Sequence, residues 1–224
     1  ALLYAFSQRS GCVGVDEPFY GPFLERTGLD HPGRAEILAA VPRKPEDSAE
    51  AMRRLFASHP GEIYMKNMAH HMVDMPWDWA SEAAHIFWIR HPRKVIRSFA
   101  KVWPQVNLDD IGIQEQVAQW AQIQGFTAPK ILVDSDEMLA NPAETFPKIC
   151  AALGIPFHAE MLQWPAGPKP YDGPWWPHWY SQVHASTGFG PANDLGEPLT
   201  GRYAEVEAEA LPYYETLYSH RLAL

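Results

Sequence analysis

The chain has little cysteine, with only Cys12 and Cys150 among its 224 residues. Each lies in small or apolar company, in Gly-Cys-Val and Ile-Cys-Ala, so we expect both to be reduced thiols packed in the interior. Two such cysteines do not form the disulfide framework of a small secreted domain. Their pattern favours a reducing, cytoplasmic compartment, and a single disulfide between them is the open alternative.

Long apolar runs and an excess of positive charge are lacking too. No run approaches the roughly 18 apolar residues that a membrane-spanning helix needs. Asp and Glu number 27 against 18 Lys and Arg, which gives a formal net charge of −9. An extended nucleic-acid-binding surface is therefore not expected. With 46% hydrophobic and 20% charged residues, the composition is typical of a globular protein with a packed core.

Several motifs of common enzymes are absent. The chain contains no G-x-x-x-x-G-K-[ST], no H-E-x-x-H, no Cys-x-x-Cys and no G-x-S-x-G. His70 and His71 are adjacent, and neighbouring histidines in extended chain point in opposite directions, so we expect no metal site there. A hydrolase or an aminotransferase is not favoured, since neither a nucleophile elbow nor a convincing cofactor lysine is present.

Strand and helix patterns alternate four times along the first two thirds of the chain. The expected strands cover residues 12–15, 63–65, 85–90 and 130–134, and the third is an unbroken apolar run that suggests burial on both faces. Helices are expected over 109–125 and 141–154. This order predicts an α/β fold, a three-layer α/β/α arrangement around a mainly parallel central sheet.

The last third of the chain changes character. Residues 158–201 are rich in Trp, Pro and Gly and lack a regular period, which predicts an irregular wrap over the domain. A final helix is expected from about Arg202 to His220. We therefore expect one domain over residues 1–224, made of an α/β core (1–157), the wrap (158–201) and a C-terminal segment (202–224).

The stretch IFWIRHPRKVIRSF, residues 86–99, gathers positive charge in an acidic chain. Arg90 follows the expected strand, and Ser98 lies eight residues later in the helix that Pro92 begins. Side chains tilt toward the start of a helix, so Ser98 leans back toward the strand end. A guanidinium, a hydroxyl and free helix N–H groups together suit a phosphate.

The remaining cations of this helix are expected to play a different part. If Val95, Phe99 and Val102 form its apolar face, then Arg93, Lys94, Arg97 and Lys101 lie on a solvated face. Either Arg97 or Arg93 is expected to reach a bound nucleotide.

The residues FWIRHPRKVIRSF resemble the motif by which sulfotransferases hold 3′-phosphoadenosine 5′-phosphosulfate. In that family the Arg and the Ser, here Arg90 and Ser98, grip the 3′-phosphate of the nucleotide. Residues 134–157, DSDEMLANPAETFPKICAALGIPF, resemble a later segment of the same family, and the tail resembles a bacterial subgroup. The resemblance implies a P-loop nucleoside triphosphate hydrolase-like fold.

The resemblance also implies catalytic residues. Family members that act on heparan-type sugars use a Glu before a Pro as catalytic base, and Glu17-Pro18 falls in the matching place. Other members use a His two residues after a Lys. Here Met68 stands two residues after Lys66, so the His alternative rests on His70 or His71. Lys66 would neutralise charge on the transferred group.

Asp16 is expected to point to the opposite face from Glu17 if the strand geometry persists, and so to be structural. Ser186, Thr187 and Gly188 show a weaker resemblance to the late loop of the family that contacts phosphate. The four tryptophans of the wrap, Trp164, Trp175, Trp176 and Trp179, are expected either to line an acceptor pocket or to order the wrap by burial.

The resemblance implies a sulfotransferase with the nucleotide as co-substrate and with a hydroxyl or amine of a small molecule or carbohydrate as acceptor. The family's phosphosulfate-binding loop and first strand would lie upstream of Ala1. We expect the natural protein to have them, because without that middle strand the core would be split. A nucleotide kinase or NTPase with Asp134 as magnesium ligand is one alternative, and a non-catalytic nucleotide-binding relative is another.

Overall fold

The computed structural model describes all 224 residues, and the chain divides into two compact units. Unit 1 comprises Ala1–Ala80 and His158–Gly190, and unit 2 comprises Ser81–Phe157 and Pro191–Leu224. A single sulfotransferase-like domain over residues 1–224 stays a prediction. No helix has the length and apolar character that a membrane span requires.

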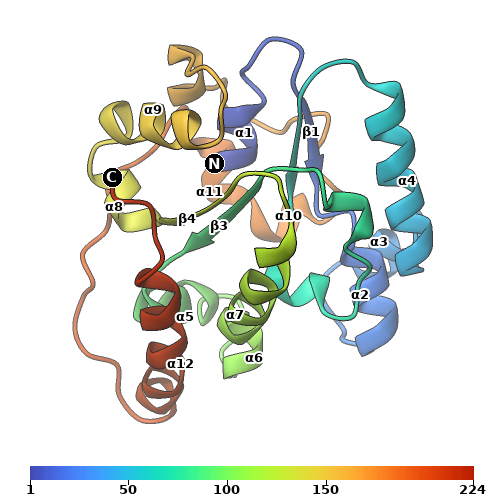
Figure 1. Ribbon diagram of the computed structural model, residues 1–224. Helices are drawn as coiled ribbons and strands as arrows, with labels where there is room; N and C mark the ends of the chain where they lie inside the picture. The colour runs from blue at the N-terminus through green and yellow to red at the C-terminus, as the bar shows by residue number, and fades with distance from the viewer. The chain divides into compact units, whose positions relative to one another are not determined.

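Unit 1 contains a pair of parallel strands with helices before, between and after them (Figure 1). Its strands are β1 (Val13–Asp16) and β2 (Ile63–Lys66). Its helices, including the 3₁₀ helices η1, η2 and η4, are α1 (Leu2–Phe6), α2 (Tyr20–Thr27), α3 (Arg34–Ala40), α4 (Pro45–Ser58), η1 (Ala69–Met72), η2 (Asp78–Ala80), η4 (Ala159–Leu162), α10 (Trp176–Trp179) and α11 (Ser181–Ala185).

Unit 2 has a second parallel pair, β3 (His85–Ile89) and β4 (Lys130–Asp134). Its helices are α5 (Pro92–Phe99), α6 (Leu108–Ile111), α7 (Ile113–Gln122), η3 (Ile123–Gly125), α8 (Ser135–Ala140), α9 (Pro142–Ala152) and α12 (Arg202–Tyr218). Helix α12 runs beside α5 (Figure 1) and also packs on α7.

The expected strands are all present and parallel, within a residue of the predicted bounds. They form two separate two-stranded sheets rather than one sheet of four. Apolar pattern identifies which residues form strands, but hydrogen-bond pairing between strands leaves no comparable signal in the sequence. The mixed α/β class with parallel strands is thus confirmed, and the three-layer arrangement around one sheet stays a prediction.

Two helices differ from the sequence prediction. The helix expected over 109–125 is broken at Gly112, whose φ of 66° lies in the left-handed region. The core side of α5 also differs, because the fully buried residue is Ile96, packed with Val106 and Val206, while Val102 is 47% exposed. Phe99 packs against the same cluster, so the predicted apolar face is confirmed at Phe99 but not at Val102, which lies beyond the end of the helix.

The cysteine prediction is confirmed. Neither Cys12 nor Cys150 forms a disulfide, and Cys150 is buried while Cys12 is half-buried. Burial raises the pKa of the Cys12 thiol, which keeps it protonated and unreactive near neutral pH.

Candidate functional site

The carboxyl ends of β1 and β2 bring two acidic residues and a lysine together in unit 1. The parallel register sets Asp16 directly beside Lys66, the last residues of the two strands. The pairing continues one step further, since the Glu17 amide donates to the Lys66 carbonyl at 2.8 Å. Ligands of parallel α/β proteins bind at this end of the strands, so the cluster lies where a reaction site is expected.

Glu17 turns the chain sharply. Its φ of 42° is in the left-handed region, which is unusual for a residue that is not glycine. Two hydrogen bonds fix the turn, from the Tyr20 amide to the Glu17 carbonyl at 3.0 Å and from the buried Ser48 hydroxyl to the Pro18 carbonyl at 2.8 Å. Such strain is common where a functional side chain must be held in one direction.

The Lys66 ammonium makes three contacts. It donates to Glu17 Oε1 in a short hydrogen bond and to the Tyr180 hydroxyl at 2.7 Å, and it lies 3.4 Å from Asp16 Oδ1. Both carboxylates are almost fully buried, while the Lys66 side chain is 30% exposed. Lys66 is thus the member of this cluster that solvent or a ligand reaches.

The prediction that Asp16 points away from Glu17 was wrong. Strand alternation places successive side chains on opposite faces only while the backbone stays extended. The left-handed turn at Glu17 ends the strand, so both carboxylates reach the same ammonium group. We name Asp16, Glu17, Lys66 and Tyr180 the strand-end cluster.

Burial and charge shift the pKa values of this cluster. Burial raises the pKa of Glu17, and the charge of Asp16 adds to that rise while Lys66 opposes it. Burial alone would lower the pKa of Lys66, but the charges of Glu17 and Asp16 outweigh it and raise that pKa. Lys66 therefore stays protonated, and Glu17 binds a proton more readily than an ordinary glutamate.

The two histidines after β2 lie on η1 rather than on extended chain, and their ring centroids are 4.5 Å apart. His71 is buried with its Nδ1 3.5 Å from Glu17 Oε2, and His70 packs on Phe23. Burial lowers the pKa of His70 to about 4 and that of His71 well below its ordinary value. Both are neutral at pH 7, and His71 is the one beside Glu17.

Unit 2 contains Arg90 and Ser98, the two residues predicted to form an anion clamp. Arg90 follows β3 directly, and its Nε is buried without a hydrogen-bond partner. No ion pair or hydrogen bond to the Arg90 side chain is present, and Ser98, on the last turn of α5, is exposed with its hydroxyl free. An unpaired buried guanidinium nitrogen is costly unless a ligand completes it.

Of the four cations predicted to form a solvated face, Arg97 and Lys101 are exposed as predicted, while Arg93 and Lys94 are partly buried. Arg93 pairs with Glu207 of α12 at 2.8 Å, and Lys94 and Arg97 donate to the carbonyls of Asn193 and Glu197. Arg93 and Lys94 depart from the prediction because Glu207 and Asp136 pair with them. We name residues 193–197 the strap, since these cations hold it against the helix.

Asp134, the magnesium ligand of the kinase alternative, is fully engaged. Its Oδ1 accepts from the amides of Asp136 and Glu137, which caps α8, and its Oδ2 accepts from the Tyr214 hydroxyl at 2.8 Å. The residue is buried, at 2% exposure. This is the role of a helix cap, and it weakens the kinase alternative. Nowhere in the chain do three or more His, Cys, Asp or Glu gather as metal ligands.

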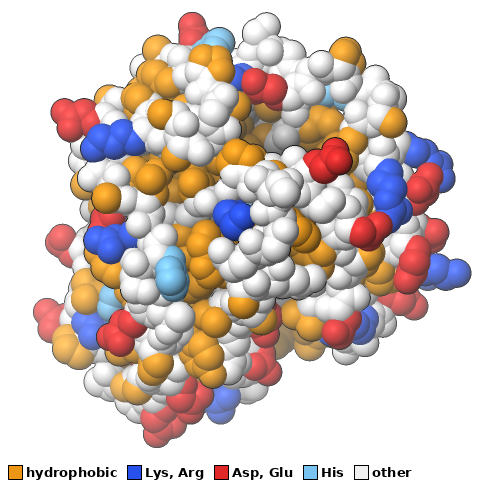
Figure 2. All heavy atoms as spheres, viewed as in Figure 1, with side chains coloured by type: hydrophobic (Ala, Val, Ile, Leu, Met, Phe, Trp, Pro, Cys, Tyr) orange, Lys and Arg blue, Asp and Glu red, His pale blue; other side chains and the backbone are white.

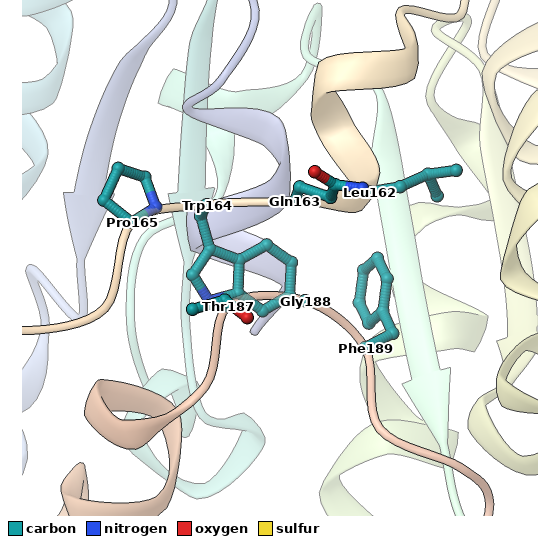
Figure 3. A pocket seen from close by; sticks show the side chains of 7 residues that line it. All are labelled: Leu162, Gln163, Trp164, Pro165, Thr187, Gly188 and Phe189. Carbon is teal, nitrogen blue, oxygen red and sulfur yellow. The ribbon is translucent and has the colours of Figure 1, made fainter.

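A cavity of about 660 Å³ lies in unit 1 beside residues 186–188, the loop predicted to contact phosphate (Figure 3). It is lined by Leu162, Gln163, Trp164, Pro165, Thr187, Gly188 and Phe189. Gly188 pairs with Gln163 in an antiparallel bridge. The Ser186 hydroxyl is already used, since it donates to the Val183 carbonyl and accepts from Trp164 Nε1. Thr187 and Gly188 thus line the cavity, while Ser186 is structural.

The wrap tryptophans differ in burial, and Trp179 packs partly buried against the core cluster that contains Trp175. Trp164 and Trp175 are buried, at 3% and 1% exposure, so they order the wrap. Trp176 is 38% exposed. Trp175 also donates from Nε1 to Asp16 Oδ2 at 3.0 Å. Nothing in the sequence pattern identified this contact or that of Tyr180, because the wrap has no period from which orientation can be inferred.

Comparison with known proteins places this chain in a family. The model of the family described as "Sulfotransferase domain" matches residues 1–221. A solved structure, "Sulfotransferase Domain from the Curacin Biosynthetic Pathway", aligns with 86% of this chain and 77% of its own, at 16% identity and a TM-score of 0.41.

Two curated relatives come from Arabidopsis thaliana. Branched-chain-amino-acid aminotransferase-like protein 2 is 32% identical over 223 residues, and protein 1 of the same name is 34% identical over 222. Each match covers 98% of this chain but only 39% and 40% of the relatives, so the chain spans about two fifths of their length. With its family match over residues 1–221, the chain belongs to the sulfotransferase domain family.

Proposed function

We propose that this protein is a sulfotransferase that uses 3′-phosphoadenosine 5′-phosphosulfate as co-substrate and a hydroxyl or amine of a small molecule or carbohydrate as acceptor. The observation that carries the proposal is the Glu17–Lys66 pair at the carboxyl ends of β1 and β2, in a chain of the sulfotransferase domain family. The nucleotide, when bound, supplies the sulfuryl group; the residues below supply the proton acceptor and the charge.

Glu17 is proposed as the base that takes the acceptor's proton. Its raised pKa, caused by burial and by Asp16, brings its proton affinity closer to the working pH, which suits general base catalysis. Lys66 is proposed to neutralise negative charge during transfer, since it is protonated and partly exposed. His71 is neutral and beside Glu17, so it is the histidine that we assign as second candidate base, in place of His70.

Arg90 and Ser98 are proposed to hold the 3′-phosphate. The buried Nε of Arg90 has no partner and the hydroxyl of Ser98 is free, so each is available to donate to an anion. Arg97, Thr187 and Gly188 stay secondary predictions, and Ser186 is the weakest because its hydroxyl already has two partners.

Nucleotide binding tests this proposal by calorimetry on the natural protein, with any residues that precede Ala1 included. We expect adenosine 3′,5′-bisphosphate to bind, and Arg90→Ala to weaken binding about 10- to 100-fold, the loss of one or two charge-assisted hydrogen bonds. Arg54→Ala removes an exposed arginine that pairs only with Glu50 of its own helix, and it should leave affinity unchanged. Equal affinity of the two variants would refute the clamp.

The non-catalytic alternative makes a different prediction. A nucleotide-binding relative without transfer activity would bind adenosine 3′,5′-bisphosphate through Arg90 but retain its biological role in Glu17→Gln. Magnesium-dependent binding of ATP in preference to the bisphosphate would favour the kinase alternative instead.

A further inference from the structure

Tyr180 of the wrap places its hydroxyl inside the strand-end cluster. It lies at the junction between α10 and α11, far in sequence from the strands. The hydroxyl oxygen is 2.7 Å from Lys66 Nζ, 2.7 Å from Asp16 Oδ2 and 3.3 Å from Glu17 Oε1. One side chain of the irregular segment therefore contacts every charged member of the cluster.

The chemistry of a hydroxyl decides how these contacts are used. A tyrosine hydroxyl has one proton to donate and can accept from other donors. Lys66 has only protons to give, so Tyr180 accepts from it. Its own proton goes to Asp16, which lies closer to it than Glu17 does. The hydrogen bonds therefore run from Lys66 through Tyr180 to Asp16.

Asp16 obtains most of its hydrogen bonds from the wrap. Besides Tyr180, its Oδ2 accepts from Trp175 Nε1 at 3.0 Å and from the Gly173 amide at 3.3 Å. Lys66 is 3.4 Å away from Asp16 but makes its shortest contact with Glu17. Since one ammonium lies between two buried carboxylates, donors that satisfy Asp16 leave the lysine to Glu17.

We infer that Tyr180 is a positioning residue for the Glu17 base: by donating to Asp16 it keeps Lys66 paired with Glu17. The inference rests on the proposed function, in which Glu17 is the base. The two strands alone supply one cation, Lys66, for the two carboxylates of Asp16 and Glu17. Trp175 and Tyr180 supply the further donors that Asp16 needs, so the inference gives the wrap a part in the chemistry.

The groups that face Glu17 come from several elements. They are Asp16 on β1, Lys66 on β2, His71 on η1, Tyr20 on α2 and Tyr180 from the wrap. His71 is neutral, and Tyr20 and Tyr180 stay protonated because burial raises the pKa of each. The ionisation of Glu17 therefore depends on Asp16, Lys66 and the hydroxyl of Tyr180.

The test is a pH titration of the Glu17 side-chain carboxyl carbon by ¹³C NMR in the natural protein and in Tyr180→Phe. Without the hydroxyl, Asp16 loses a donor and competes for Lys66, so the titration midpoint of Glu17 should rise by about one pH unit. This readout needs no acceptor and no bound nucleotide. A shift of less than about 0.3 unit would overturn the inference.

Tyr4→Phe is the matched control. The Tyr4 hydroxyl donates to Asp172 of the same wrap at 2.6 Å, so the variant loses a wrap contact of the same kind outside the cluster. Its Glu17 midpoint should stay at the wild-type value. An equal shift in both variants would mean that Tyr180 acts only by anchoring the wrap, and would contradict the inference.

Asp16→Asn tests the route through which Tyr180 acts, and it keeps the inference falsifiable if Tyr180→Phe does not fold. Removing the Asp16 charge should lower the Glu17 midpoint, because that charge raises the pKa of Glu17. In this background Tyr180→Phe should move the midpoint by less than half as much as in the wild type. A midpoint that fails to fall in Asp16→Asn, or an undiminished effect in the double variant, would contradict the inference.

These outcomes are separable from the proposed function. If the Glu17 midpoint behaves as expected but the protein does not bind adenosine 3′,5′-bisphosphate, Tyr180 positions Glu17 in a protein of another activity. If the bisphosphate binds and the midpoint does not move in Tyr180→Phe, the sulfotransferase proposal survives and the role of Tyr180 does not.

Discussion

At the scale of single residues, the site depends on a few buried ionisable groups at the ends of β1 and β2. The resemblance of motifs singled out Glu17 and Lys66 as candidates, and the structure brings the two side chains into contact. The sequence misplaced Asp16, since the left-handed backbone of Glu17 is unusual for a non-glycine residue and leaves no signal in the pattern. Tyr180 was missed because its orientation depends on the tertiary path of the wrap.

The lowered pKa of His70, on η1, predicts how the free energy of unfolding depends on pH. Burial lowers the pKa of His70 from 6.5 to about 4, so the folded state takes up this proton less readily than the unfolded chain. The contribution of His70 to stability is thus complete above about pH 6.5 and is lost as the pH falls toward 4. The shift corresponds to at most about 3 kcal/mol of unfolding free energy.

We therefore expect urea unfolding of His70→Gln to show a weaker loss of stability between pH 6.5 and 4 than the wild type. His178→Gln, a change at an exposed histidine of α10, should follow the wild-type pH profile. If His70→Gln and the wild type lose stability in parallel over this range, then His70 is not the buried neutral group described here.

At the scale of elements, α5 shows why a basic helix face need not be a solvated one. The sequence correctly placed the start of this helix at Pro92 and Phe99 on its apolar face, but it left out Ile96 and included Val102, which lies beyond the helix end. A helix of eight residues has little more than two turns, so few positions define its apolar face. Arg93 and Lys94 bind Glu207 and the strap, while Arg97 donates to the strap and stays exposed.

The Arg93–Glu207 pair makes this arrangement testable. The Glu207 side chain is 8% exposed and that of Arg93 is 19% exposed, so removing the arginine leaves a nearly buried carboxylate without its partner. We expect Arg93→Ala to lower the unfolding free energy by about 3 kcal/mol, measured by urea denaturation.

Two further variants control for this effect. Adding Glu207→Gln to Arg93→Ala should recover part of the loss, because the unpaired charge is then removed. Arg54→Ala, which breaks only an exposed pair with Glu50, should cost less than about 1 kcal/mol. Equal costs for Arg93→Ala and Arg54→Ala would show that α5 faces solvent after all.

At the scale of the whole molecule, the sequence predicted the class and the strand positions better than the sheet. The alternation of apolar strands with amphipathic helices predicts parallel strands, and both strand pairs are parallel. Which strands are neighbours depends on contacts distant in sequence, so the division into two sheets had no signal in the local patterns.

The charge of the molecule agrees with a small anionic ligand rather than a polymer. Acidic and basic side chains are interspersed over the face in Figure 2, where no continuous basic surface is visible. The net charge of −9 works against general attraction of anions. Any nucleotide affinity must therefore come from specific groups, of which Arg90, with its unpartnered nitrogen, is the strongest candidate.

Glu17 is proposed to be the base in sulfuryl transfer. This role is tested by measuring release of adenosine 3′,5′-bisphosphate from 3′-phosphoadenosine 5′-phosphosulfate in the presence of a pool of phenol, alcohol, amine and sugar acceptors. We expect turnover by the natural protein, and a fall of about 10²- to 10⁴-fold in Glu17→Gln with unchanged affinity for the bisphosphate. Turnover that is equal in Glu17→Gln, or magnesium-dependent turnover of ATP alone, would contradict this role.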